Sequence, residues 1–412
     1  MADNKVTEKF SYLTSILSSY SGAEQRIKLR DVPSHLLSYN YSAMNSAEAQ
    51  WLRAHARQLQ STVTYIPMWQ NVAYLSSDFL GGKSLYMDKD YMYGFHNCDA
   101  IEIFRKDDVM HHAGSNMTKI VKRYDENVIV LKNGISDPML KENTYVLPLI
   151  RCATQPASSM SYIYSNGTDV TMNFEDILYV PTFDISPTIL SEYDYTGIDK
   201  FNRYNLPLTL DSREMFLYEP QWDGDDSLQL SIDKLSNKLE NKTGVFKYDL
   251  KNNKSYDKHS VKVLLTSRKM INNMIRFFHR VSGRYKSFYC PTWANDFDVV
   301  RDIRGGDKVI YTNLDDLYRY YLSNGRSKKI VIFTKDGKSY IHDILTYSQD
   351  KVDGITYGKV LLTDSQEEQI NLNNIAMVSF LNLVRLDSDD LQINYESNVV
   401  ADVTLAMKEV DD

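Results

Sequence analysis

Apolar residues recur at the spacing of an α-helix in two segments of this 412-residue chain. The first, SAEAQWLRAHARQLQ (46–60), begins at Ser46, a candidate N-cap. The second, SRKMINNMIRFFHRVSGR (267–284), begins at Ser267 and ends at Gly283. The apolar faces consist of Ala49, Leu52, Ala56 and Leu59 in the first segment and of Met270, Met274, Phe277 and Val281 in the second. The spacing predicts two amphipathic helices that each cover a sheet.

Alternating segments rich in β-branched and aromatic residues flank each predicted helix. They are residues 27–42 and 260–267 before the helices and residues 61–69 and 285–293 after them. Further short alternating segments follow in both halves, with turn residues such as KNG (132–134) and KDG (335–337) between some of them. This pattern predicts a strand, a helix and a strand, followed by a small antiparallel sandwich or barrel.

Four segments of the first half recur in the same order in the second half. The pairs are YIPMWQN (65–71) with YCPTWAN (289–295), IEIFRKDD (101–108) with IVIFTKDG (330–337), LIR ending at Arg151 with LVR ending at Arg385, and DVTMNFEDI (169–177) with DVTLAMKEV (402–410). Their offsets are 224, 229, 234 and 233 residues. Chance similarity between strands would not preserve this order, so the sequence favours an internal duplication.

The repeated Pro-x-Trp-x-Asn segment predicts a similar local structure in both halves. Because proline has no N–H to donate to a ladder, we expect Pro67 and Pro291 at a strand end or edge. Trp69 and Trp293 are then expected to pack as core anchors, each in its own half. A binding platform formed by the indole rings is the alternative.

The predicted fold class is therefore α+β and β-rich, with two tandem copies of an αβ unit, each followed by a small antiparallel β sandwich or barrel domain. The expected division is an N-terminal arm or short helix (1–22), a first αβ unit (23–95), a first β domain (96–179), a connector (180–220), a second αβ unit (221–304) and a second β domain (305–412). The aromatic residues of the connector predict that it lies against another surface.

Composition narrows the class of protein. The chain is 43% hydrophobic and 25% charged, which is the range of globular proteins, and we expect no membrane span and no secretory signal. Three scattered cysteines, Cys98, Cys152 and Cys290, predict small core residues and not a disulfide framework. The net charge of −7 without a long basic run gives no indication of nucleic-acid recognition. Thirty tyrosines suit protein interfaces or sugar surfaces.

No motif of an enzyme class emerges from the sequence, and we expect no catalytic, cofactor or metal site. His96, His111 and His112 are the best candidate metal ligands, but neighbouring strand residues point to opposite faces. RLDSDD (385–390) lacks the glycine and distal glutamate of an EF-hand, which favours a solvated turn. The acidic segment EPQWDGDDS (219–227) surrounds Trp222 as in some sugar-binding or glycosidase clefts, and an exposed acidic loop is the simpler interpretation.

Three further segments show a distinctive pattern of residues. They are YSGAEQRIKLRDVPSHLLSYNYS (20–42), RVSGRYKSFYCPTWANDF (280–297) and RLDSDDLQINYESNVVADVTLAMKEV (385–410). These segments resemble the tail proteins of tailed bacteriophages. The resemblance implies a structural protein of the virion, near the distal end of the tail, and no enzymatic activity. The richness in Asn, Lys and Tyr and the unmatched connector depart from the family pattern, which is compatible with another ring of the tail.

The expected function is a structural component of the distal tail, tail tip or tail adaptor, made in the host cytoplasm and located in the virion. Its expected partners are copies of itself in a ring, as a hexamer first and as a trimer or dodecamer otherwise, together with tail tube, hub and fibre proteins. We expect the strands at 169–177 and 402–410 to be sheet edges that pair with neighbours. The alternatives are a receptor- or carbohydrate-binding tail component and a polysaccharide-degrading enzyme, for which Asp223, Asp225 and Asp226 are the candidate acids.

Overall fold

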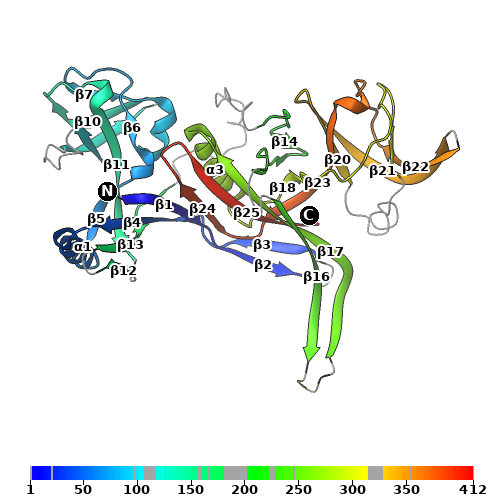
Figure 1. The fold of residues 1–412 in the computed structure, drawn as a ribbon, viewed down its shortest axis with the longest axis horizontal. Coiled ribbons are helices and arrows are strands. Elements are labelled where there is room, and N and C mark those ends of the chain that lie inside the picture. The colour runs from blue at the N-terminus through cyan, green and yellow to red at the C-terminus, as the bar shows by residue number, and fades with distance from the viewer. Residues whose placement is uncertain are drawn as a thin grey trace.

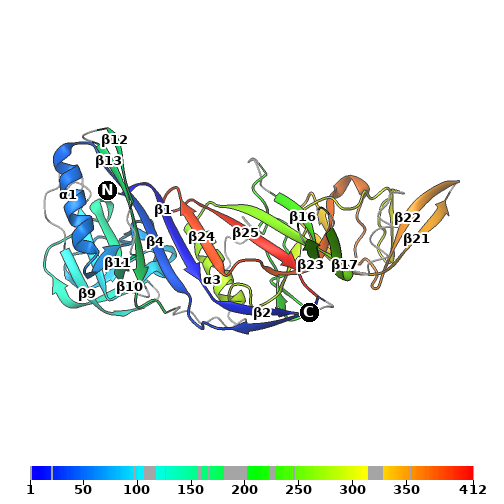
Figure 2. The ribbon, with the colours of Figure 1, turned by 90° about the horizontal axis from the view of Figure 1, so that it is seen from below.

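A computed structural model describes most of the chain. The described residues are 2–19, 22–95, 98–105, 117–125, 127–155, 159–164, 167–180, 202–222, 228–240, 242, 244, 246–313, 328–352 and 354–411. The molecule is elongated, with β-rich lobes at its two ends, helix α3 (Arg268–Val281) near its middle, and one long hairpin that leaves the body (Figures 1 and 2).

Hydrogen bonding joins 21 strands into one network, and two further two-stranded sheets accompany it. Every strand pairing within the named ladders is antiparallel. The strands of the first half are β1 (Ala2–Ser11), β2 (Thr14–Ser18), β3 (Glu24–Lys28), β4 (Ser34–Ala43), β5 (Val63–Pro67), β6 (Ala73–Tyr74), β7 (Gly82–Tyr86), β8 (Ala100–Arg105), β9 (Met117–Tyr124), β10 (Val128–Ile135), β11 (Thr144–Thr154), β12 (Ser159–Tyr164) and β13 (Gly167–Asp176). Those of the second half are β14 (Thr209–Leu210), β15 (Arg213–Glu214), β16 (Leu228–Glu240), β17 (Phe246–Leu265), β18 (Phe288–Pro291), β19 (Val309–Thr312), β20 (Lys329–Thr334), β21 (Ser339–Val352), β22 (Ile355–Leu362), β23 (Ile375–Leu386), β24 (Asp390–Tyr395) and β25 (Ala401–Glu409).

The predicted fold class is wrong. Two tandem αβ units with separate β domains would give two sheets, each with its own helix, whereas the strands of both halves share one antiparallel network and the protein is mostly β. The described residues contain two α-helices and four short 3-10 helices. The 3-10 helices are η1 (Trp69–Asn71), η2 (Lys89–Phe95), η3 (Lys141–Asn143) and η6 (Leu372–Asn374).

The segments that match in sequence lie on strands with comparable partners. In the first half β13 pairs with β4 and β11, and in the second half β25 pairs with β17 and β23. Likewise β5 and β8 both pair with β11, and β18 and β20 both pair with β23. These ladders lie within one network, so the halves share strand connectivity and do not form independent αβ units.

Helix α1 (Ser46–Leu59) covers the sheet of the first half. Its buried residues are Leu52, Ala56 and Leu59, and they pack against residues of β4, β11 and β13. The predicted boundaries and apolar face are confirmed, but the N-cap is Asn45 and not Ser46, since the Asn45 side chain accepts a hydrogen bond from the Glu48 N–H at 2.9 Å. The opposite face of the helix is exposed.

Helix α3 is buried around most of its circumference, unlike α1. The helix begins at the predicted position, with Ser267 as its N-cap, and Ser282 ends it in the left-handed conformation. Besides the predicted apolar face, Ile271, Ile275, Phe278 and His279 are also buried. Helix α3 is covered on this further side by residues 202–218 of the expected connector. These residues pack against the same core through Tyr204, Leu206, Met215, Phe216 and Tyr218. The prediction that aromatic residues of the connector lie against a surface is confirmed for these residues.

Each end lobe has a core of its own. One cluster is formed by residues of β6 to β11, including Leu85, Ile103 and Ile129. The other is formed by residues of β19 to β23, including Ile332, Val360 and Phe380. Figure 1 shows these lobes on opposite sides of the α3 layer.

Strand β1 joins the two halves at the centre. It pairs with β4 of the first half and with β24 of the second, so Phe10 lies opposite both His35 and Leu391. The described residues 7–19 do not form the short helix that was one alternative for this segment, since most of them lie in β1 and β2. Strands β2 and β3 form a separate two-stranded ribbon below the central strands (Figure 1).

The two strands that were expected to be sheet edges are paired on both sides. Strand β13 is paired with β4 on one side and with β11 and β12 on the other, and β25 is paired with β17, β23 and β24. The prediction that 169–177 and 402–410 are free edges is therefore wrong.

The longest exposed element is the hairpin of β16 and β17, which Figure 1 shows projecting from the body. The ladder runs from Leu228 opposite Val261 to Glu240 opposite Phe246. At its base, Val261 belongs to the central core and β17 continues the sheet by pairing with β25. The distal part carries large apolar side chains that remain half or more exposed, among them Ile232 at 72% and Phe246 at 54%.

The two matched tryptophans differ in burial. Pro67 and Pro291 end β5 and β18, as predicted. Trp293 is buried and stacks on Phe333, with ring centroids 5.3 Å apart, which confirms its role as a core anchor. Trp69 is only partly buried, at the margin of the core beneath α1.

In the described residues, no helix is long and apolar enough to cross a membrane.

Candidate functional site: an ionic cluster at the base of the hairpin

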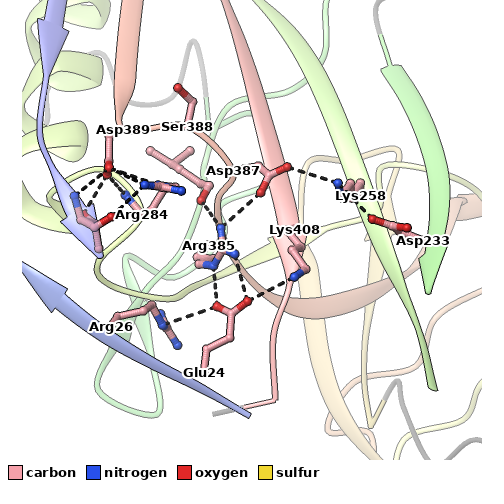
Figure 3. Close-up of polar contacts among 12 residues, drawn as sticks. Glu24, Arg26, Asp233, Lys258, Arg284, Arg385, Asp387, Ser388, Asp389 and Lys408 are labelled. Carbon is pink, nitrogen blue, oxygen red and sulfur yellow. Dashed lines mark hydrogen bonds and ion pairs between the residues drawn. The ribbon is translucent and has the colours of Figure 1, made fainter. Parts of the chain in front are cut away.

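The segment RLDSDD (385–390) connects β23 to β24 and is not the solvated turn that the sequence favours. Arg385 is 4% exposed, and the side chain of Asp389 is 10% exposed. The carboxylates of Asp387 and Asp389 face the cationic groups of arginine and lysine side chains, as Figure 3 shows. We call this group of charged residues the ionic cluster; its members are Glu24, Arg26, Asp233, Lys258, Arg284, Arg385, Asp387, Asp389 and Lys408.

Glu24 of β3 and Arg385 of β23 form the buried centre of the ionic cluster. The Arg385 Nε and Nη2 groups donate to the two oxygens of Glu24 at 2.7 and 3.0 Å, and Lys408 Nζ donates to Oε1 at 3.1 Å. Burial alone would raise the pKa of Glu24, but the hydrogen bonds and charges of Arg385 and Lys408 lower it to about 2. The pair is therefore fully ionised at neutral pH and holds the β2–β3 ribbon against the sheet.

Asp389 forms a second anchor for the same ribbon. Its carboxylate accepts hydrogen bonds from the backbone N–H and the hydroxyl of Thr14, both at 2.8 Å, and from the backbone and side chain of Arg284 at 2.9 to 3.1 Å. Burial opposes ionisation, but these hydrogen bonds dominate and lower the pKa of Asp389. Thr14 begins β2, so both strands of the ribbon are attached.

The glycine that follows α3 makes this approach of Asp389 possible. Gly283 has a φ of +63°, in the left-handed region, and a Cβ at this position would lie 2.6 Å from Asp389 Oδ1 and 3.1 Å from its Cα. The left-handed residues Ser282 and Gly283 turn the chain so that Arg284 faces Asp389.

The ionic cluster continues outward to the projecting hairpin. Arg385 Nη1 donates to Asp387 at 3.3 Å, Asp387 lies 3.5 Å from Lys258 Nζ, and Lys258 Nζ lies 3.1 Å from Asp233. The side chains of Lys258 and Asp233 are 35% and 55% exposed, so these outer pairs contribute little stability on their own. They place charged groups at the point where the hairpin leaves the body.

A shallow groove of about 470 Å³ opens beside these outer pairs. Its lining includes Leu230, Lys258, His259, Asp387 and Met407. His259 is buried, which lowers its pKa, and its Nε2 atom has no hydrogen-bond partner among the described residues. The groove is lined by the base of the hairpin and by β25.

A second polar cluster lies inside the protein where β1 joins the halves. His35 contacts Glu8 at 2.8 Å and Asp176 at 3.3 Å, and the Tyr395 hydroxyl donates to Glu8 at 2.6 Å. Burial would lower the pKa of His35, but the hydrogen bonds and charges of Asp176 and Glu8 raise it to about 9. Because all of these side chains are buried, the cluster stabilises the junction and has no access to a substrate.

The residues singled out for possible chemistry are only partly described. His96, His111, His112, Asp223, Asp225 and Asp226 lie outside the described residues. The Trp222 ring is about half exposed, and its Nε1 donates to Glu219 at 2.9 Å. All three cysteines are buried, as predicted for core residues. Within the described ranges, no three His, Cys, Asp or Glu side chains are placed to hold a metal ion.

The sequence offered one signal for the ionic cluster that pattern reasoning did not use. The segments 20–42, 280–297 and 385–410, which stand out in the sequence, each supply part of it: Glu24 and Arg26 from the first, Arg284 from the second, and Arg385, Asp387, Asp389 and Lys408 from the third. Segments that lie far apart in the sequence therefore meet at one place in the structure.

Comparison with known proteins does not extend this interpretation, since neither a protein-family model nor a curated protein matches the chain.

Proposed function

We propose that this protein is a structural, non-catalytic subunit of a bacteriophage tail, at the distal tail, tail tip or adaptor ring. There it would assemble with copies of itself and with tail tube, hub and fibre proteins. The observation that carries the proposal is the β16–β17 hairpin, an extended ribbon that projects from the body and carries several exposed large apolar side chains.

An exposed apolar ribbon has a physical cost for an isolated protein. Apolar surface in water is unfavourable, and an unpaired strand edge can pair with other chains. The side chains of Leu230, Ile232, Phe246 and Tyr248 are each at least half exposed along this one element. Contiguous exposed apolar residues of this kind mark contact sites with other macromolecules, which favours an assembly component.

The ionic cluster supports the same role, because it makes the body that carries the hairpin rigid. It connects the β2–β3 ribbon, the turn after α3, the β23–β24 turn, β25 and the hairpin base through charged pairs. A subunit that transmits position between rings needs such fixed geometry. The resemblance to phage tail proteins rests on the segments that meet here, which adds to the support.

Ring assembly requires a heterologous contact, in which one surface of each copy meets a different surface of the next copy. An element that projects from one side of an elongated body suits this kind of contact. A hexamer is the expected closed form, with a trimer or a dodecamer as the other forms compatible with a ring.

Two measurements test the proposal. Mass spectrometry of purified phage particles whose genome encodes the chain should detect it in the tail, at a copy number that is a multiple of three. Light scattering of the purified full chain should show a closed oligomer at micromolar concentration or on mixing with tail tube or hub protein. Absence of the chain from the particles contradicts the proposal.

A carbohydrate-binding tail component is the second candidate. Its support is the half-exposed Trp222 ring, whose indole N–H is held by the Glu219 carboxylate, an arrangement that can present an aromatic face to a sugar. Binding of host surface polysaccharide by the wild-type chain, and its loss in Trp222→Ala but not in Trp51→Ala, would favour this function. Trp51 is a suitable control because its ring is also exposed.

A further inference from the structure

Most of the exposed large apolar residues that the structure describes on the hairpin lie on one face, whereas Leu239, 60% exposed, lies on the other. Lys238 pairs with Tyr248, and Lys234 Nζ lies 5.5 Å from the centre of the same tyrosine ring, so these three side chains share a face. Alternate residues of a strand point to the same side. Leu230 and Ile232 therefore lie on the face of Lys234, and Phe246 lies on the face of Tyr248. We call this surface the hairpin face; its apolar residues and lysines are Leu230, Ile232, Lys234, Lys238, Phe246 and Tyr248, and its acidic residues are Glu240 and Asp257.

The hairpin face continues the apolar surface of the central core. Leu228 is two residues before Leu230, packs against the central core and pairs with the core residue Val261. Beyond Leu228 the core layer ends while the ladder goes on to Glu240. The same side of one ribbon is thus covered by the protein's own residues at its base and exposed further out, as expected of a surface that another chain covers.

The hairpin also has a charge opposite to that of the rest of the protein. Residues 228–265 contain eight lysines and four acidic residues, a formal charge of +4, whereas the whole chain has −7. The remaining residues therefore carry −11. Lys234 and Lys238 lie on the hairpin face itself, each over an aromatic ring. Glu240, which pairs with Lys238, and Asp257 lie on the same face, so the attraction to the acidic body of another copy comes from the net charge of the hairpin as a whole.

The size of the ribbon limits the area of such an interface. Strand β16 has 13 residues, which at about 3.4 Å per residue extends about 44 Å. Two strands spaced about 4.8 Å apart then present roughly 400 Å² on each face. The hairpin face alone therefore supplies about half of the roughly 800 Å² that each side contributes to a standard protein interface, and contacts with the adjoining body supply the rest.

We propose that the hairpin face is a self-association site, on which the acidic body of a second copy of this chain docks. This inference deepens the proposed function and rests on it in part, since it assigns the ring contact to the hairpin and names the body of a second copy as its binding partner. The contact is heterologous, because the basic hairpin of each copy meets the acidic body of the next.

The test compares two double variants of the full chain in sedimentation and light scattering. Ile232→Ser with Tyr248→Ser removes two exposed apolar groups from the hairpin face. Leu140→Ser with Leu345→Ser removes two equally accessible groups from the end lobes and is the matched control. We expect the hairpin variant to self-associate at least tenfold more weakly than wild type and the control to remain within twofold. Circular dichroism should show that both variants are folded.

Cross-linking identifies the surface that binds the hairpin face. In a mixture of isotope-labelled and unlabelled chains, Lys234 and Lys238 should cross-link to the body of the other isotope form, and these cross-links should weaken as salt concentration rises. A hairpin variant that associates as strongly as wild type, or equal weakening in the control, overturns the inference.

The same cross-linking in intact particles separates this inference from the proposed function. If the chain is present in the tail but its hairpin lysines link only to a different tail protein, self-association through the hairpin is wrong while the tail role stands. If the chain is absent from tails but forms hairpin-dependent oligomers, the opposite holds.

Discussion

Replacement of Glu24 by glutamine is predicted to release the β2–β3 ribbon from the body. Glu24 is 5% exposed in its side chain and holds Arg385 through two hydrogen bonds and Lys408 through a third. Removing one partner of a buried ion pair costs about 3 to 5 kcal/mol, because the remaining charge is left without compensation. Glutamine keeps the shape and one acceptor, so we expect a cost near the lower value, about 3 kcal/mol.

Hydrogen exchange measures this release locally. A loss of about 3 kcal/mol corresponds to roughly a hundredfold faster exchange, at about 1.4 kcal/mol for each factor of ten. We expect the amides of β2 and β3 to lose about this much protection in Glu24→Gln, while those of α3 keep theirs. The effect should be the same between pH 6 and 8, because the pKa of Glu24, about 2, keeps the carboxylate ionised there.

Asp390→Asn is the matched control for an exposed pair. Asp390 lies 2.8 Å from Lys9, but both side chains are about 40% exposed, so its loss should cost less than about 1 kcal/mol. Unchanged protection of β2 and β3 in Glu24→Gln would refute the reasoning. So would a loss that is equally large in α3, since the residue would then support the whole fold and not the ribbon.

Three further predictions concern stability. Trp293→Ala should lower the free energy of unfolding by about 3 to 5 kcal/mol, whereas Trp69→Ala, at a partly buried position, should lower it by about half as much or less. Urea unfolding of both variants measures this difference. Equal effects would contradict the difference in burial. The pKa of His35 in the folded protein is about 9, above its ordinary 6.5, so the stabilisation by this residue is complete below pH 6.5 and is lost as pH rises through 9. The free energy of unfolding should therefore decline across this range in the wild type and not in His35→Gln. An identical decline in the variant would exclude His35 as its source. Gly283→Ala should destabilise the folded protein by more than about 1 kcal/mol, since alanine is strained at this φ and its Cβ would lie too close to Asp389. The melting temperature should therefore fall. An unchanged melting temperature would show that the turn can adapt.

Local patterns in the sequence were sufficient to locate α1, α3 and most strands of the end lobes. Their apolar residues recur at the period of a helix or a strand, and this period is a local property. The exceptions have identifiable causes. Phe10, Leu13 and Leu17 happen to fall at helical spacing although β1 and β2 are strands, and KNG (132–134), predicted as a turn, lies within β10. The Asn- and Lys-rich hairpin shows little alternation, because its face is not buried within the chain.

The candidate site could not be predicted because its interactions are between distant parts of the chain. Glu24 and Arg385 are separated by 361 residues, and neither forms a recognisable motif with its sequence neighbours. RLDSDD was expected to be a solvated turn since its acidic residues suggest exposure. Only the fold shows that Thr14, Arg284 and Arg385 surround these carboxylates.

The sequence similarity between the halves predicted comparable strands but not their assembly. Short matches fix the type of element, whereas the joining of both halves through β1 depends on pairing between residues such as Val6 and Tyr395 that no repeat indicates. For this reason the structure contains one antiparallel network and not the expected tandem αβ units.

Cryo-electron microscopy of tails from a phage whose genome encodes this chain is the most direct test of its proposed role. We predict a closed ring of copies around the tail axis near the distal end, in which the β16–β17 hairpin of each copy lies on the body of the next. A tail without density for this chain, or one in which its copies do not touch one another, would contradict that role.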